Sequence, residues 1–434
     1  MVRSLSGLTT RGRCLLAAGV AAGVCAAVLN ERDLLRVAVF VVALPLFVVL
    51  LTAVSKVRIA AARSLDAERV PVGGRSEVRL DLWRTGRMPA GEVLVEDALP
   101  YALGARPRFV AERLPRRHEP VSLRYHVQPT VRGIQQVGPL RATVTDPFGL
   151  CEFDRELVPT SRLVVVPRVV TLRGLPSGSG IGTGEDNSVR LRAGQGETDV
   201  MVRQYRQGDD LRKVHWPSTA RRDEIMVRVE ERPWRSGTTV LLDHRSAAHR
   251  GSGPGASLEW AVEFTASVCL HLGHAGQRVR LVSEHGRPIA DVPEGAGHAH
   301  DGAVLDALAA LRPTHERDIV PGTDPGHGQE LIAVLGTIGA ESVRELTRYR
   351  PRAARSLAVL LDTPAWTDRA RVPEDPPAPG GDRGPEVTVE EAAGLLRAAG
   401  WSVVVAAPHS AVPDVWAELC RTGISPAPVA GRAP

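Results

Sequence analysis

The segment from Arg203 to Glu231 gathers the side chains of this sequence that are best suited to chemistry. Arginine forms bidentate hydrogen bonds with carboxylates, and it also binds phosphate or an acidic peptide. The segment therefore predicts either a self-paired structural element that docks a partner, or a site for an anion or a partner peptide. The candidate residues are Arg203, Tyr205, Gly208, Asp209, Asp210, Arg212, His215, Trp216, Ala220 and Arg221.

A hydrolase is the alternative interpretation of the same segment, with Asp210, His215 and Ser218 as its catalytic residues. A catalytic serine is commonly presented by a Gly-x-Ser-x-Gly turn, next to backbone donors for the oxyanion. Ser218 lies in Trp-Pro-Ser-Thr-Ala instead. We therefore predict that the protein is not an enzyme and uses no cofactor.

A second candidate position is Asp243, at the end of the apolar run 239–243. In von Willebrand A domains an aspartate at this place begins an Asp-x-Ser-x-Ser motif, whose oxygens suit Mg²⁺. Here Arg245 and Ala247 replace the two hydroxyl residues, so a metal-dependent adhesion module is an alternative and we predict no metal there. Other histidines offer another metal possibility, although most lie in Gly- and Pro-rich sequence where exposure is the ordinary outcome. They are His271, His274, His298, His300, His315 and His327.

The arginine-rich segment resembles the family catalogued as domain of unknown function fifty-eight. The family pattern is Arg-x-Tyr-x-x-Gly-Asp-x-x-Arg-x-x-x-Trp-x-x-x-Ala-Arg, and the sequence matches it from Arg203 to Arg221. The resemblance implies a membrane protein with a degenerate von Willebrand A-like domain, often encoded beside a MoxR-type AAA ATPase. The biochemical role of the family is unassigned, so the resemblance implies no reaction. We predict a protein-binding adaptor in cell-envelope or protein-complex maturation, with that ATPase as the expected partner.

Two apolar segments, 14–30 and 34–54, open the chain and have the length needed to span a bilayer. Arg11 and Arg13 precede the pair and Lys56 and Arg58 follow it, whereas the short connection carries two acids. The positive-inside rule then predicts a cell-membrane protein with two spanning helices and both termini in the cytoplasm. A cleaved signal peptide in place of the first helix is the alternative.

Residues 64–170 change to a period of two, in which apolar and polar residues alternate, for example from Val121 to Gln128. Such alternation, with turn residues between the runs, predicts a small antiparallel β-sandwich. The sequence Asp146 to Leu150 is predicted to be a turn that caps a strand. The Gly- and Ser-rich stretch 171–185 predicts a linker, and residues 186–236 hold the family motif.

From 237 to 425 strand-like and helix-like runs alternate, which predicts a mostly parallel, doubly wound α/β domain of the von Willebrand A type. The Pro-, Gly- and charge-rich residues 364–386 predict a disordered insertion within it.

The charge composition does not indicate nucleic-acid binding. The chain of 434 residues carries 54 Lys and Arg against 49 Asp and Glu, and the two signs are interleaved instead of forming a basic patch. The five cysteines contain no Cys-x-x-Cys pair, which argues against a disulfide framework or a structural zinc site. The expected partners are therefore a protein and the lipid bilayer.

Overall fold

The chain forms two compact units in the computed structural model, Met1–Val166 and Pro167–Pro434. The residues that the structure describes are 8–55, 59–85, 92–112, 114–115, 119–146, 148–176, 200–204, 219–220, 226–230, 237–321, 330–348, 350, 355–366 and 387–422.

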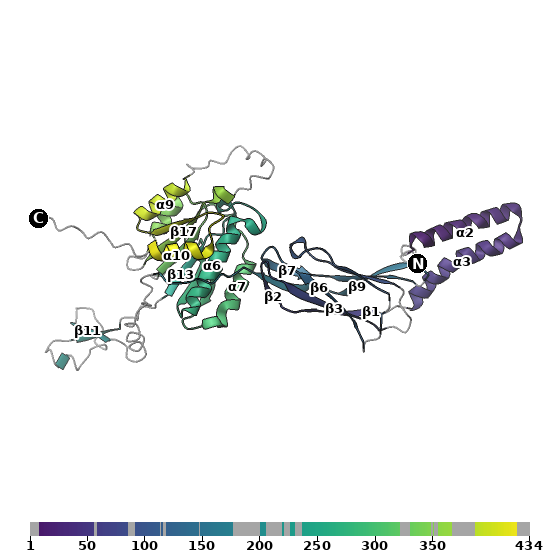
Figure 1. Cartoon of the computed structure of the whole chain (residues 1–434), viewed down its shortest axis with the longest axis horizontal. Coiled ribbons are helices and arrows are strands. Elements are labelled where there is room, and N and C mark those ends of the chain that lie inside the picture. The colour runs from purple at the N-terminus through teal and green to yellow at the C-terminus, as the bar shows by residue number, and fades with distance from the viewer. Residues whose placement is uncertain are drawn as a thin grey trace. The chain divides into compact units, whose positions relative to one another are not determined.

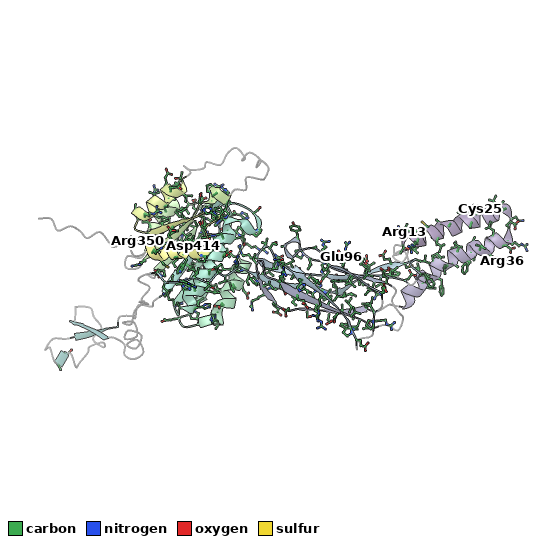
Figure 2. All side chains as sticks on the ribbon, viewed as in Figure 1. Arg13, Cys25, Arg36, Glu96, Arg350 and Asp414 are labelled. Carbon is green, nitrogen blue, oxygen red and sulfur yellow. The ribbon has the colours of Figure 1, made fainter. Side chains whose placement is uncertain are left out.

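A helical hairpin begins the first unit and consists of α2 (Thr10–Leu29) and α3 (Arg32–Ser55) (Figure 1). Both helices are long and apolar enough to cross a membrane. Gly19 allows them to pack closely, because a Cβ there would lie 2.8 Å from a methyl group of Val42. Arg36 lies near the loop that joins the helices, and Arg13 lies toward the other end of the hairpin (Figure 2). The expected pair of apolar helices is thus present.

The turn between strands β8 (Leu140–Thr145) and β9 (Glu152–Val158) packs against the open end of this hairpin. Thr9 caps α2, since its hydroxyl accepts a hydrogen bond from the backbone of Gly12 and donates one to the carbonyl of Gly149 at 2.7 Å. The carboxylate of Asp146 accepts hydrogen bonds from the backbone of Phe148 and Cys151, which closes the turn. The predicted turn therefore also holds the start of the first helix.

The rest of the first unit is strand-rich and encloses an apolar core. Its sheets have the orders β1-β3-β6, β2-β10-β7 and β5-β4-β8-β9. The pairing is antiparallel except for β2 with β10, which run parallel. The alternation seen in the sequence buries one face, as in Val78, Leu80 and Leu82 of β3. The remaining strands are β1 (Ile59–Leu65), β2 (Arg69–Pro71), β3 (Ser76–Arg84), β4 (Val93–Asp97), β5 (Arg108–Ala111), β6 (Val121–Val127), β7 (Gly133–Val137) and β10 (Ser161–Val166).

The second unit contains a six-stranded sheet of order β15-β14-β13-β16-β17-β18. All neighbours are parallel except β15, an antiparallel edge strand that the sequence pattern did not predict. Apolar runs such as 331–335 and 357–361 are fully buried, as is usual in parallel sheets with both faces covered. The strands are β13 (Gly237–Leu242), β14 (Arg278–Ser283), β15 (Pro288–Val292), β16 (Glu330–Leu335), β17 (Ser356–Leu361) and β18 (Ser402–Ala406).

Helices cover both faces of this sheet, as Figure 1 shows. Residues alternate along β13, so that Val240 and Leu242 pack under α6, α7 and α10 while Leu241 packs under α8 and α9. The expected α/β region is therefore present. The helices are α6 (Ser257–His274), α7 (Asp301–Ala310), α8 (Ala340–Arg348), α9 (Val389–Ala398) and α10 (Val412–Thr422).

Two stretches that the sequence predicted to be flexible start with residues that pack against the second unit. Leu172 is 4% exposed within the core of the second unit, and the carbonyl of Gly174 accepts a hydrogen bond from the indole of Trp416, so the linker does not begin at 171. Thr363–Trp366 form a short 3-10 helix, η6, because Trp366 is buried with its ring edge against Trp260. Pro and Gly content alone did not reveal these apolar anchors.

Candidate functional site

The crevice between β13 and β16 is the topological switch point of the sheet. From β13 the chain passes to β14 on one side and later returns to β16 on the other. In open α/β sheets, ligands bind outside the carboxyl ends of the strands at such a point. Asp243 follows β13 and Gly336 follows β16, so both stand at this crevice. The aspartate singled out in the sequence therefore occupies the ligand-prone position.

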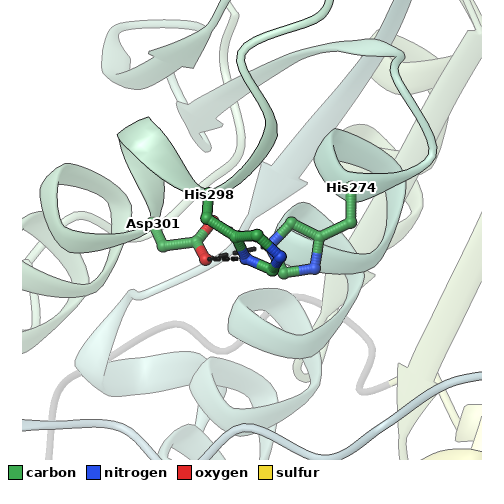
Figure 3. Close-up of side chains that lie close together, drawn as sticks. All are labelled: His274, His298 and Asp301. Carbon is green, nitrogen blue, oxygen red and sulfur yellow. Dashed lines mark hydrogen bonds and ion pairs between the residues drawn. The ribbon is translucent and has the colours of Figure 1, made fainter.

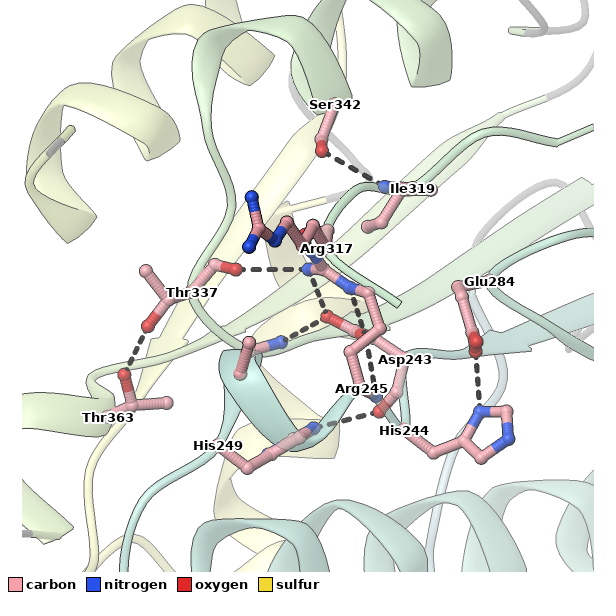
Figure 4. A network of polar contacts seen from close by, with 12 residues as sticks. Asp243, His244, Arg245, His249, Glu284, Arg317, Ile319, Thr337, Ser342 and Thr363 are labelled. Carbon is pink, nitrogen blue, oxygen red and sulfur yellow. Dashed lines mark hydrogen bonds and ion pairs between the residues drawn. The ribbon is translucent and has the colours of Figure 1, made fainter. Parts of the chain in front are cut away.

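Arg245 forms a bidentate ion pair with the carboxylate of Asp243 (Figure 4). Its Nε donates to Oδ1 at 2.9 Å and its Nη2 donates to Oδ2 at 2.8 Å. The backbone nitrogens of Arg245 and Gly336 donate to the same two oxygens. A divalent cation needs these oxygens as ligands, and here they already face a positive charge.

The remaining donors of the guanidinium are also used, because Nη2 donates to the carbonyl of Thr337 at 3.0 Å and Nη1 donates to the carbonyl of Arg317. Asp243 is 0% exposed and Arg245 is 2% exposed. Burial alone lowers the pKa of Arg245, but the hydrogen bond and the charge of Asp243 outweigh it and raise the pKa above its ordinary value. Arg245 therefore stays charged, and the protein satisfies the hydrogen bonds of its guanidinium.

The short 3-10 helix η3 (Ser246–Ala248) follows β13 and lies across the crevice, next to the residues that follow β16. The backbone of Thr337 donates to the carbonyl of Ala248 at 2.8 Å. A side chain on Gly336 would collide with that carbonyl, so the close approach of the two segments requires glycine. Ser246, Ala247 and Arg250 remain exposed, and we call these three residues the switch-point edge.

Buried histidines flank the ion pair on both sides. His244 Nδ1 lies 2.5 Å from Glu284 Oε2, and Thr314 donates to the other carboxylate oxygen of Glu284 at 2.9 Å. Burial raises the pKa of Glu284, but the hydrogen bond from His244 and further favourable contacts lower it to about 2. His249 lies between the Asp243 carbonyl and Ser257, and burial lowers its pKa. These contacts hold residues 243–249 in one conformation.

A buried histidine of this site also lies next to a serine hydroxyl. His249 Nδ1 lies 3.1 Å from the hydroxyl of Ser257. A nucleophilic serine needs a base such as histidine at this distance. Ser257 is 0% exposed and His249 is 8% exposed, so both side chains are buried. The switch-point edge, by contrast, is exposed at the same crevice.

Most of the predicted motif falls outside the residues that the structure describes. Arg203 lies in β11 (Val200–Gln204), which pairs antiparallel with β12 (Met226–Glu230), and Gln204 faces Met226. The two strands therefore bring the ends of the motif segment together. Ala220 is described within a short helical turn. The positions outside the described residues are Tyr205, Gly208, Asp209, Asp210, Arg212, His215, Trp216, Ser218 and Arg221.

Sequence reasoning found Asp243 and Arg245 but missed the residues that complete the site, Gly336, Thr337 and Arg317. A signal was present for two of them. Gly336 and Thr337 directly follow the buried run 331–335, and the carboxyl ends of neighbouring parallel strands meet at one edge.

Comparisons with known proteins agree with the sequence resemblance. Residues 201–333 match the family model described as "Protein of unknown function DUF58". No curated protein matches the chain.

Two of the solved structures that match resemble a part of the chain. One is the CARDB domain of a Pyrococcus furiosus protein in complex with di-metal ions, at 16% identity and a TM-score of 0.21, covering 26% of this chain and 97% of that one. Another is a cohesin module from a Clostridium perfringens family 33 glycoside hydrolase, at 14% identity and a TM-score of 0.20, covering 26% of this chain and 100% of that one.

Proposed function

We propose that this protein is a membrane-anchored, non-enzymatic adaptor whose α/β domain binds a protein partner in the cytoplasm without a metal ion. The domain is of the von Willebrand A type in this proposal. Asp243 stands at the end of the first strand of the sheet, where such domains begin their Asp-x-Ser-x-Ser motif. In this proposal the domain keeps the aspartate at the ligand-binding edge of the sheet, but Arg245 and Ala247 replace the two hydroxyl residues that would bind a metal ion.

The contact of Arg245 with Asp243 is the observation that carries the proposal. A guanidinium that is hydrogen-bonded to both carboxylate oxygens supplies the positive charge that Mg²⁺ supplies in a metal site. Because the arginine is part of the chain, the loops at the edge are held closed without a bound ion. The same contact argues against a metal-dependent adhesion module at Asp243.

The proposed orientation rests on the hairpin and its flanking charges. Antiparallel helices place the start of α2 and the end of α3 on the same side of a bilayer. Arg11 and Arg13 lie in the first turns of α2, and Lys56 follows α3 in the sequence. Apolar side chains along the helices are exposed, as lipid-facing residues are, including Val24, Phe40 and Phe47. Everything after the hairpin would then face the cytoplasm.

Protease protection tests this orientation. In inverted membrane vesicles, added protease should degrade the region after the hairpin, whereas intact spheroplasts should protect it. Protection in inverted vesicles together with digestion in spheroplasts would place the bulk of the chain outside the cell and refute the cytoplasmic proposal.

The partner that we propose is a MoxR-type AAA ATPase, on the strength of the family resemblance, and its binding surface is the switch-point edge. The test measures binding of the purified ATPase from the same genome to the full chain in detergent, by biolayer interferometry with and without EDTA. Binding should be unaffected by EDTA. Ala247→Trp places a bulky ring on the exposed edge and should weaken binding by about tenfold or more.

Ala398→Trp is the matched control for this substitution. Ala398 is also exposed, but it ends α9 ahead of β18, so it lies at the amino edge of the sheet, opposite to the switch-point edge. The Ala398→Trp variant should bind the ATPase with the affinity of the unmodified chain. Equal weakening by both variants would reject the edge as the surface, binding that requires Mg²⁺ would reject the built-in cation, and absence of binding would reject this partner.

A further inference from the structure

A cluster of two histidines and one aspartate lies away from the switch point, where α6 ends and α7 begins (Figure 3). His274 is the last residue of α6, and Asp301 is the first residue of α7. His298 belongs to the short 3-10 helix η5 (Gly297–His300), which leads into α7. The proposed adaptor function makes no use of these three side chains.

The three side chains point their ligand atoms at one another. His274 Nε2 lies 2.8 and 3.0 Å from the two carboxylate oxygens of Asp301, and His298 Nδ1 lies 3.0 Å from one of them. The two imidazole rings have centroids 3.9 Å apart. All the candidate ligand atoms lie within 4.8 Å of one another.

We propose that His274, His298 and Asp301 form a binding site for a divalent transition-metal ion of the zinc type. Imidazole nitrogen and carboxylate oxygen are the ligands that Zn²⁺ prefers besides thiolate. Ligand atoms about 2.0–2.1 Å from a tetrahedral Zn²⁺ are about 3.3 Å apart. The nitrogen–oxygen distances of 2.8–3.0 Å need to open by only a few tenths of an ångström to admit the ion.

Helix electrostatics explain only part of this arrangement. A histidine at the end of α6 and an aspartate at the start of α7 each complement the helix dipole, so a simple surface pair accounts for His274 and Asp301. It does not account for His298, whose ring faces the same carboxylate oxygen and packs against the ring of His274. One cation shared by three ligands matches this geometry, because it accounts for the positions of all three side chains.

Exposure of the side chains leaves the proposed site open to solvent. His274 and Asp301 are 34% and 26% exposed, whereas His298 is 82% exposed. His274 and Asp301 stand on the helices α6 and α7, and His298 lies on the solvent side of the site. Water from the solvent would be the fourth ligand. A bound ion would join the end of α6 to the start of α7 and so stabilise the helix pair.

Calorimetric titration of the full chain in detergent with ZnCl₂ tests the site, using metal-free protein without a histidine tag. The unmodified chain should bind one Zn²⁺ with micromolar affinity, and EDTA should reverse the binding. His298→Ala and His274→Ala should each weaken binding by about tenfold or more, as loss of a ligand does. His409→Ala removes an exposed histidine from a different loop and should bind like the unmodified chain.

Thermal unfolding separates metal binding from a hydrogen-bonded surface group. Zn²⁺ should raise the Tm of the unmodified chain and of the His409→Ala variant, and at the same Zn²⁺ concentration it should raise the Tm of the His298→Ala variant by clearly less. His298 is largely exposed, so that variant is expected to fold. Zinc affinity that is unchanged in both cluster variants, or millimolar and weaker in the unmodified chain, would overturn the proposal.

Discussion

Each unit of the protein contains a buried arginine–aspartate pair, and the two pairs differ in how the chain builds them. In the first unit Arg63 of β1 holds Asp97 at the end of β4, and the partners are 34 residues apart. In the second unit Asp243 and Arg245 are separated by one residue. Both arginines grip their carboxylate with two nitrogens, and both carboxylates are 0% exposed.

The long-range pair joins two sheets of the first unit. The guanidinium of Arg63 also donates to the carbonyls of Val137 and Pro159, and the hydroxyl of Tyr125 donates to Asp97 at 2.6 Å. This pair is a structural clamp inside a core. The local pair stands at the ligand-prone edge of its sheet, so the same chemistry there occupies a binding position. Location in the fold, and not the type of pair, decides which of the two stands where open α/β sheets bind ligands.

Asp97→Ala should have the largest effect, because it leaves the guanidinium of Arg63 and the hydroxyl of Tyr125 buried without their shared acceptor. Removal of one partner from a buried pair costs about 3–5 kcal/mol of the free energy of unfolding. Urea denaturation of the full chain measures this loss of unfolding free energy. Asp81→Ala breaks the more exposed pair with Arg79 and should cost at most about 1 kcal/mol. Similar costs for both variants would show that Asp97 is no clamp.

Arg245→Ser should destabilise the second unit by about 3 kcal/mol without added metal, since it leaves Asp243 buried and uncompensated. Combining it with Ala247→Ser creates an Asp-x-Ser-x-Ser sequence, and this double variant should bind Mg²⁺ in a calorimetric titration. At a Mg²⁺ concentration tenfold above the Kd, about 1.4 kcal/mol should be recovered. Mg²⁺ binding by the unmodified chain would contradict the role assigned to Arg245.

The carboxyl of Glu284 provides a test by pH. Its pKa is lowered from 4.5 to about 2 in the folded chain, so its contribution to stability is complete above pH about 5 and is lost as the pH falls toward 2. The unmodified chain should therefore lose on the order of 2 kcal/mol more than Glu284→Gln between pH 6 and pH 2.5.

Glu341→Gln is the control for this measurement, because that exposed carboxylate has only a surface pair with Arg344. Its unfolding should follow the pH dependence of the unmodified chain. Identical pH profiles for Glu284→Gln and the unmodified chain would refute the stabilising contact with His244.

Tyr125→Phe should have the smallest effect on the free energy of unfolding. It separates the contribution of the Tyr125 hydroxyl from that of Arg63. Burial and the hydrogen bond to Asp97 raise the pKa of Tyr125 well above its usual value, so the hydroxyl remains a donor. Its loss should cost about 1.5 kcal/mol, as for a hydrogen bond to a charged group. Chemical denaturation measures it, and a cost equal to that of Asp97→Ala would mean that Arg63 contributes little.

Local pattern predicted much of this fold. The apolar runs at the start of the chain, the alternation in Val121 to Val127 and the buried strand 357–361 each appear as helix or strand. These features depend on neighbours in the sequence, whose periodicity reports the face that is buried. The anchors Leu172 and Trp366 were missed because their apolar contacts come from helices α6 and α10, far along the chain.

Sequence alone determined that the chain carries two apolar helices, a strand-rich region, an α/β region and a family motif, and that an arginine stands two residues after Asp243. Only the tertiary structure decided that this arginine grips the aspartate, that Arg63 and Asp97 meet across two sheets, and that His274 faces His298. The physical reason is that a hydrogen bond or a metal ligand set depends on distances of about 3 Å. Such distances between residues far apart in the sequence are set by how strands and helices pack.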